Sequence, residues 1–300
     1  MANTQALKGR IRSVSKTKQI TSAMQMVAAS RMRRAQEATR ASAPYALAAR
    51  ELLAVLSTHE SVKNHPLFIE RPVKTRLLIV IGADGGLAGA YTTNLMKLYA
   101  DQLIEDDKNG VKNATIVVGS KAAQFVTRLK DTVVLGLYQD LPDHPDGRQL
   151  HTILDTAQDK FTSGEVDAVD VVFTEYVNSL KQVARVIRVL PAGSGVDKSF
   201  LDDPDVSVKA TSLLNDAKYE PSPAAVLDGV AYRLVGAQLY QALLEARASE
   251  YGMRMMAMKN ATDNAKYLID DLTLAMNKAR QAAITQELTE ISGGVEALSE

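Results

Sequence analysis

The chain has 300 residues, enough for one large domain or two ordinary ones, and 46 % of them are hydrophobic. It contains no cysteine, which excludes disulfides, thiol catalysis and cysteine-ligated metal clusters and is typical of a reducing compartment. Its 35 basic and 35 acidic side chains give a net charge of zero, which argues against a uniformly basic nucleic-acid-binding protein. No apolar run approaches the ~18–20 residues of a membrane span, so we expect a soluble protein.

Charge is unevenly distributed along the chain. Residues 1–45 hold nine basic side chains and a single acid, Glu37, which sum to +8 (9 − 1), so residues 46–300 sum to −8. The first 36 residues contain no acid at all. Such asymmetry points to a partner surface, a membrane or a targeting peptide.

The sequence from Asn3 to about Thr58 predicts a long amphipathic helix. Apolar residues recur there at steps of three and four, namely Leu7, Ile11, Val14, Ile20, Met24 and Val27. Pro44 is the only proline in the stretch and should kink or divide the helix. An arginine-rich start without acids is also typical of a mitochondrial transit peptide, but this pattern runs long without a break.

The middle of the chain, residues 74–191, predicts an α/β domain with a largely parallel sheet. Apolar strands are expected at residues 76–81, 115–118, 132–135, 170–176 and 183–190. Helices are expected between them at 90–106, 120–129 and 148–161. Residues 192–222, with prolines in and around the segment, predict a linker.

The C-terminal residues 223–300 predict a second long helix with a continuous coiled-coil seam. After Pro223 no proline occurs, and apolar residues dominate a run of alternating three- and four-residue steps. The run comprises Leu227, Val230, Leu234, Ala237, Gln241, Leu244, Ala248, Tyr251, Met255, Met258, Thr262, Ala265, Ile269, Leu272, Met276, Ala279 and Ala283.

Two long helices at opposite ends of the chain are most simply paired antiparallel. Residues 1–58 and 223–300 then form a discontinuous coiled-coil shaft, and the α/β domain is inserted between them. The C-terminal helix should overhang by about a dozen residues, ~20 Å. Its apolar tip needs a partner that buries it, or is a frayed tail; the tip comprises Ile284, Leu288, Ile291, Val295 and Leu298.

Motifs for chemistry are weak. The glycine-rich segment Gly82–Gly89 follows a strand and opens a helix, where phosphate binds in nucleotide proteins, but neither a Walker A motif nor G-x-G-x-x-G is present. Asp140, Asp143, His144, Asp146 and His151 could gather a metal, although a solvated turn is the simpler interpretation. We therefore predict no catalytic, cofactor or metal site.

Three segments resemble the gamma subunit of bacterial F-type ATP synthase. They are Ile20–Ala35 (ITSAMQMVAASRMRRA), Gly82–Tyr91 (GADGGLAGAY), and Met255–Ala265 (MMAMKNATDNA) followed by Ala279–Ile291 (ARQAAITQELTEI). The resemblance implies a non-catalytic rotor shaft with a Rossmann-like α/β insert. Such a shaft couples proton-driven rotation of the c ring to ATP synthesis at the beta subunits.

The resemblance also implies partners and contact residues. The partners are three alpha and three beta subunits, epsilon and the c ring, at the cytoplasmic face of the bacterial plasma membrane, with no nucleic acid. Met24 would lie beside the lever loop of beta with Arg254 close by, and a polar catch for beta would comprise Arg280, Gln281, Thr285 and Glu287. A basic face would present Arg31, Arg33 and Arg34 to acidic neighbours.

Three positions depart from the family pattern, and alternatives remain. Ala88 stands where cysteine is frequent, Met276 where an aromatic residue is usual and Met253 where a small residue is common. The alternative functions are a basic coiled-coil protein that binds nucleic acid or acts as an adaptor, and a small nucleotide-dependent enzyme. The coupling ion is selected in the c ring and its stator, not in this chain.

Overall fold

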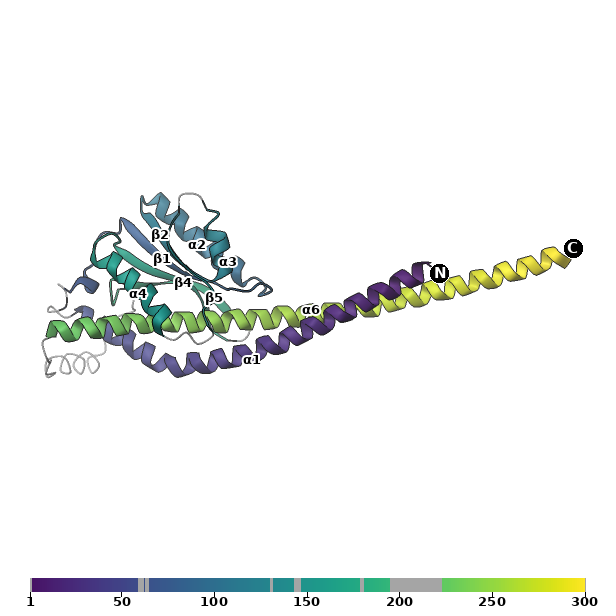
Figure 1. The fold of residues 1–300 in the computed structure, drawn as a ribbon, viewed down its shortest axis with the longest axis horizontal. Coiled ribbons are helices and arrows are strands. Elements are labelled where there is room, and N and C mark those ends of the chain that lie inside the picture. The colour runs from purple at the N-terminus through teal and green to yellow at the C-terminus, as the bar shows by residue number, and fades with distance from the viewer. Residues whose placement is uncertain are drawn as a thin grey trace. The chain divides into compact units, whose positions relative to one another are not determined.

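The computed structural model describes residues 2–58, 62, 65–129, 132–142, 147–178, 181–194 and 223–299, without the side chains of 2–3, 54–55, 58, 147–149, 223–227 and 293–299. It divides into two units: a helix-pair unit, residues 1–29 with 254–300, and a central unit, residues 30–253. Two helices contribute to both units, α1 (Ala2–Thr58) and α6 (Pro223–Ser299) (Figure 1). Residues 195–222 of the predicted linker, Asp143, His144 and Asp146 of the possible metal cluster, and the side chains of Val295 and Leu298 lie outside the described residues.

The central unit is built on a mixed five-stranded sheet. Its strands are β1 (Thr75–Ile81), β2 (Lys112–Val118), β3 (Val133–Tyr138), β4 (Ala168–Tyr176) and β5 (Gln182–Leu190). Their order is β3-β2-β1-β4-β5; β1 to β4 run parallel and β5 is antiparallel to β4. All five predicted strands are confirmed. Strands β1, β2 and β4 are buried on both faces and leave continuous apolar runs in the sequence, whereas the edge strands β3 and β5 are partly exposed.

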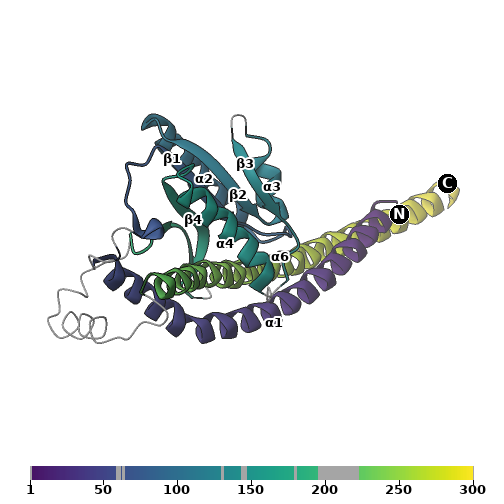
Figure 2. The ribbon, with the colours of Figure 1, turned by 60° about the vertical axis from the view of Figure 1, so that its left-hand side comes forward.

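Helices cover both faces of the sheet in the central unit (Figure 2). On one face α2 (Tyr91–Lys108) and α3 (Ser120–Val126) share a core with Leu78, Val80 and Val117. On the other face the core unites α4 (Gly147–Thr162) and the short η2 (Pro66–Phe68) with residues of α1 and α6. The predicted class, an α/β domain combined with long terminal helices, is thereby confirmed.

The predicted seam of α6 is correct but incomplete. Every seam position from Val230 to Ala283 is buried or partly buried. In the central unit α6 carries a second apolar face, which lies in the same core as the sheet and comprises Ala231, Val235, Leu239, Ala242, Leu243 and Ala246. Alternating steps of three and four residues identify a single apolar stripe, whereas a helix that is packed on two sides carries two apolar stripes.

In the helix-pair unit, small and polar residues of α1 face α6. The hydroxyl oxygens of Thr21 and Thr262 lie 2.8 Å apart, and Thr21 and Ala28 are buried. Ile20 and Val27, which the sequence placed on the apolar stripe, are 60 % and 55 % exposed, so that part of the prediction is wrong. The stripe shifts by one position because Thr21 and Ala28 allow close approach of the helices, and no apolar periodicity marks a threonine.

Pro44 does not divide α1, which runs as one helix from Ala2 to Thr58. Within the central unit, helix pairing is antiparallel: the space beside Gly252 is bounded by Met32, whereas Pro44 and Leu47 line the same groove as Gln238 and Gln241.

Among the helices of the described ranges, none has an apolar stretch long enough to cross a lipid bilayer.

The glycines after β1 and β2 are required by close backbone approach. A Cβ added to Gly119 would lie 2.5 Å from the carbonyl oxygen of Gly82, and Gly119 has a φ of +98°. Gly119 N–H donates to Tyr138 at 2.7 Å and Gly82 N–H donates to Val118 at 2.8 Å, which fixes the ends of neighbouring strands. The close approach of the two backbones accounts for Gly82 and Gly119 without a phosphate-binding role for either residue.

Replacing Gly119 by alanine should destabilise the chain by about 2–5 kcal/mol, the sum of the φ strain and the steric clash. The matched control is Gly110→Ala, because Gly110 also has a positive φ, +70°, but no atom lies within 4 Å of the added Cβ. The control should lose only about 1–2 kcal/mol. Denaturant unfolding of the full chain measures both; equal losses would contradict the packing argument.

Candidate functional site

The end of α6 presents one mixed face to solvent. Ile284, Leu288 and Ile291 are 49 %, 62 % and 65 % exposed. At about 100° per residue these three side chains fall within an arc of about 60°. The four predicted catch residues are also exposed and flank this arc, with Arg280 and Glu287 on one side and Gln281 and Thr285 on the other.

This face lies beyond most of α1 in the helix-pair unit. Thr21 lies opposite Thr262, so Ala2 corresponds to about residue 281 (262 + 21 − 2). Figure 1 shows α6 continuing past the N-terminal end of α1. The predicted overhang is thus present in the described residues, and its apolar side chains have no described part of α1 across from them.

Met24 and Arg254 belong to the same unit and are both half-buried. The Thr21–Thr262 register places Met24 opposite about Lys259 (21 + 262 = 24 + 259), five residues from Arg254. That separation is about 7.5 Å along the helix axis. The structure therefore brings the predicted lever residues near one another along the pair.

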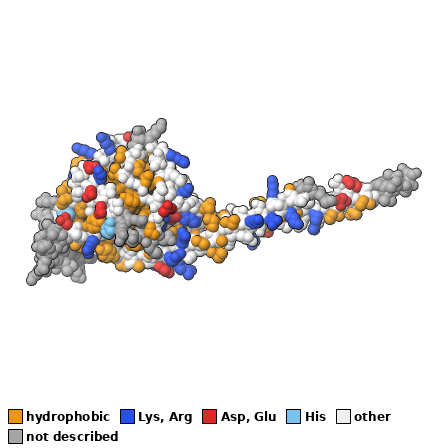
Figure 3. Space-filling model, viewed as in Figure 1, with side chains coloured by type: hydrophobic (Ala, Val, Ile, Leu, Met, Phe, Trp, Pro, Cys, Tyr) orange, Lys and Arg blue, Asp and Glu red, His pale blue; other side chains and the backbone are white. Residues whose placement is uncertain are grey.

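Of the three arginines in the predicted basic face, one contacts an aromatic ring of this chain and the other two are exposed to solvent. The Arg31 guanidinium carbon lies 5.8 Å from the ring centroid of Tyr251, a cation–π contact within the central unit. Arg33 and Arg34 are exposed. Figure 3 shows basic side chains along the helix pair and acidic ones near the described end of α6, while both kinds also occur on the central unit.

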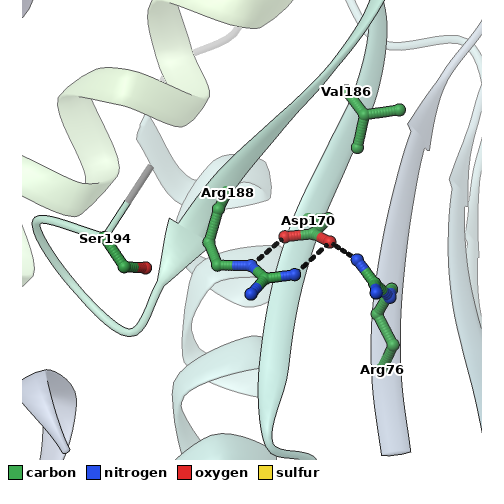
Figure 4. Close-up of a pocket in the computed structure, with 5 residues that line it drawn as sticks. All are labelled: Arg76, Asp170, Val186, Arg188 and Ser194. Carbon is green, nitrogen blue, oxygen red and sulfur yellow. Dashed lines mark hydrogen bonds and ion pairs between the residues drawn. The ribbon is translucent and has the colours of Figure 1, made fainter. Parts of the chain in front are cut away.

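Charged residues inside the central unit are paired with each other. In Figure 4 Asp170, 2 % exposed, lies between Arg76 and Arg188; Arg188 donates from Nε at 2.7 Å and from Nη2 at 3.0 Å. Arg76 also pairs with the buried Asp106, 3.0 Å from Nε to Oδ2. Burial raises the pKa of Asp106 although Arg76 opposes it, and the Asp170 hydrogen bond raises the pKa of Arg188. The adjoining hollow of about 290 Å³ is thus bordered by guanidinium groups already engaged by carboxylates.

A larger groove of about 670 Å³ lies between α1, β4, β5 and α6 in the central unit. It is lined by Arg40, Arg50, Glu175, Arg185 and Glu245, among others. Burial raises the pKa of Glu245, and the Glu175 charge adds to the effect, while hydrogen bonding from Gln241 opposes it. Sequence reasoning had no signal for this groove, since its lining comes from four separate elements.

Among the residues that the structure describes, no group of three His, Asp or Glu side chains could hold a metal ion. Of the possible metal cluster, His151 instead lies 2.7 Å from the Tyr232 hydroxyl, which donates to Asp155 at 2.7 Å. In the glycine-rich loop, Asp84 accepts from Ser120 N–H at 2.9 Å, which places a carboxylate where a phosphate would need a cation.

The geometry defines a class: a helix-pair protein with an α/β insert and an exposed mixed tip. The family model described as "ATP synthase" matches residues 3–298. The ATP synthase gamma chain of Acidithiobacillus ferrooxidans is 41 % identical over 298 residues, 99 % of this chain and all of that one. The gamma chain of Bordetella pertussis is 38 % identical over 302 residues, again covering 99 % and 100 %.

A solved structure of the Euglena gracilis mitochondrial ATP synthase contains a chain of the same fold, with a TM-score of 0.69 at 19 % identity, covering 99 % of this chain and 95 % of that one. The chain belongs to the ATP synthase gamma chain family, whose members are non-catalytic subunits of the F-type ATPase and form its central stalk.

Replacing Glu245 by glutamine should raise the melting temperature of the full chain by a few degrees near pH 7, since it removes a buried charge. A carboxyl whose folded pKa is raised stabilises the fold below its unfolded value, near 4.5, and loses that contribution as pH rises through the folded pKa. The difference between variant and parent should therefore shrink towards pH 4.5. The control is Glu37→Gln at an exposed position, which should leave the melting temperature unchanged. An unchanged or lower melting temperature for the Glu245 variant at pH 7 would show that the charge of Glu245 does not destabilise the fold.

Proposed function

We propose that this chain is the rotor shaft that couples proton-driven rotation of a c ring to conformational change and ATP synthesis at beta subunits. The observation that carries the proposal is the mixed face at the end of α6, where exposed apolar residues are flanked by exposed polar ones. Three large apolar side chains at one end of a helix are costly in water, so they favour a surrounding apolar partner. The polar residues on both flanks supply contacts that change as such a shaft turns.

The resemblance and the charge pattern support particular partners. Three alpha and three beta subunits would surround the helix pair, with Arg33 and Arg34 facing acidic segments. Epsilon and the c ring would contact the central unit. The chain would then sit peripherally at the cytoplasmic face of the bacterial plasma membrane. Solved relatives are described as the rotor of the Euglena enzyme and as the central stalk and c ring of the Tetrahymena thermophila enzyme.

The two catch residues that begin this face offer a direct test. Replacing Arg280 and Gln281 together by alanine should lower steady-state ATP turnover of the reconstituted complex about thirtyfold, since two polar contacts of about 1 kcal/mol each are lost. Lys108→Ala with Asn109→Ala is the matched control, an exposed cation followed by an exposed amide at the end of α2, outside the helix-pair unit. The control should keep parental turnover. Parental turnover in the Arg280/Gln281 variant would remove these residues from the proposed catch.

A further inference from the structure

The helix α6 crosses the sheet of the central unit at the edge where related folds bind ligands. In open α/β sheets, ligands bind outside the carboxyl ends of the parallel strands, where the strand order reverses. Here the order β3-β2-β1-β4-β5 reverses between β1 and β4. The residues that follow β1, β2 and β3, and one at the end of β4, all contact a single short segment of α6 or the group that binds it.

Three polar contacts seat residues 246–250 of α6 at this edge. The fully buried Tyr91, which opens α2, donates from its hydroxyl to the Ala246 carbonyl at 3.3 Å. Ser249 is also fully buried and donates to the carbonyl of Thr174, near the end of β4, at 3.0 Å. The third contact is an ion-pair cluster centred on Arg247.

Arg247 joins three segments through one buried guanidinium, whose side chain is 6 % exposed. Its Nη2 donates to Asp84 Oδ2 at 3.1 Å and to the Leu141 carbonyl at 3.0 Å, and its Nη1 donates to Glu250 Oε2 at 3.1 Å. Asp84 lies in the loop after β1 and Leu141 in the loop after β3, whereas Glu250 lies one turn along α6. Burial would lower the pKa of Arg247, but Glu250 and Asp84 outweigh it and raise the pKa.

Asp84 is itself fixed by the other loops. Its Oδ1 accepts from the Ser120 N–H at 2.9 Å and from the Asp140 N–H at 3.2 Å, so the loops after β2 and β3 are bound to the same carboxylate. Burial would raise the pKa of Asp84, but these two hydrogen bonds and Arg247 lower it. One carboxylate thus ties three strand ends to one arginine of α6.

Most of the remaining contact between α6 and this domain is apolar, as at Ala231, Ala242 and Ala246. Polar contacts nearer the start of α6, of His65 with Asp228 and of Tyr232 with His151 and Asp155, are more exposed to solvent than the Arg247 cluster. Apolar burial is non-directional, so it opposes separation of the surfaces more than it opposes sliding or rotation. Charge-assisted hydrogen bonds have defined directions and a fixed donor fork. The Arg247 cluster is therefore suited to set the axial and rotational position of α6 on the sheet.

We propose that residues 246–250 of α6 occupy the ligand-binding edge of the α/β domain, and that Arg247 is the positioning residue that locks the domain to the shaft helix. The inference rests on the proposed rotor function. Torque applied to the domain is then transmitted to α6 without rotation of the domain relative to this helix. The helix α6 continues without interruption to Ser299.

The test uses the full complex reconstituted in vesicles. The triple variant D84N/R247M/E250Q removes the cluster without leaving an unpaired buried charge. The Asp84→Asn change within it keeps a side-chain oxygen that accepts from the Ser120 and Asp140 amides. Loss of the lock should reduce protons pumped per ATP hydrolysed to about half of the parental value or lower, because the directional hydrogen bonds that fix the position of α6 are removed and the apolar contact that remains is non-directional. The single variant R247K keeps the charge but not the donor fork, so it should retain more of the coupling than the triple variant.

The matched control is D170N/R188M, which removes a buried pair whose ion contacts lie within the sheet. It should lower the melting temperature as the triple variant does but keep the parental pumping ratio. If the triple variant fails to assemble, D84N alone should give a smaller loss of coupling. A parental pumping ratio in whichever lock variant assembles, or an equal fall in the control, overturns the proposal. Absence of pumping by the parent complex would instead refute the rotor function itself.

Discussion

Burial of α6 in the core of the central unit is the interaction on which the rest of the structure depends. Its inner face, including Val235, Leu239 and Leu243, shares one apolar core with β1, β2 and β4. A full burial of each such side chain contributes about 1.5–3 kcal/mol. The seam on its other side remains available for α1, as the buried cluster of Ala35, Ala248 and Tyr251 shows. The same helix is therefore both a core element of the domain and one half of the helix pair.

Two groups of charged residues can be distinguished in the described chain: those in buried ion pairs of the central unit and those exposed on the terminal helices. Inside the central unit, Arg76, Arg188 and Arg247 each engage buried carboxylates, which holds segments together. In the helix-pair unit and at the exposed positions of α1, charged residues such as Arg34 and Glu287 face solvent. Internal pairs give the domain a fixed shape, whereas exposed charges are placed for partners that would turn past them.

The sequence predicted those features that depend on local periodicity. The central strands β1, β2 and β4 were readable because both of their faces are buried, and the seam from Val230 to Ala283 was readable because its spacing is regular. Ile20 and Val27 were misplaced because close helix contact there uses Thr21 and Ala28, which carry little apolar signal. The exposed tip was predictable from the loss of cations after Arg280 and the apolar residues that follow.

The Arg247 cluster was out of reach of sequence reasoning, although the glycine-rich loop that contains Asp84 was recognised as unusual. Its members, Asp84, Leu141 and Arg247, come together only after the sheet has formed and α6 has crossed its edge. An arginine within an apolar helical run, as at position 247, was the one available signal. It did not identify the partners in the sheet domain, because Asp84 and Leu141 are more than 100 residues away in the sequence.

Direct observation of rotation tests the central claim. Because the chain has no cysteine, a single Asp101→Cys on the exposed side of α2 would carry a probe at one defined position. With the surrounding subunits immobilised and ATP supplied, we expect stepwise rotation of the probe in one direction that stops when ATP is removed. Steady ATP hydrolysis with a stationary probe would contradict it.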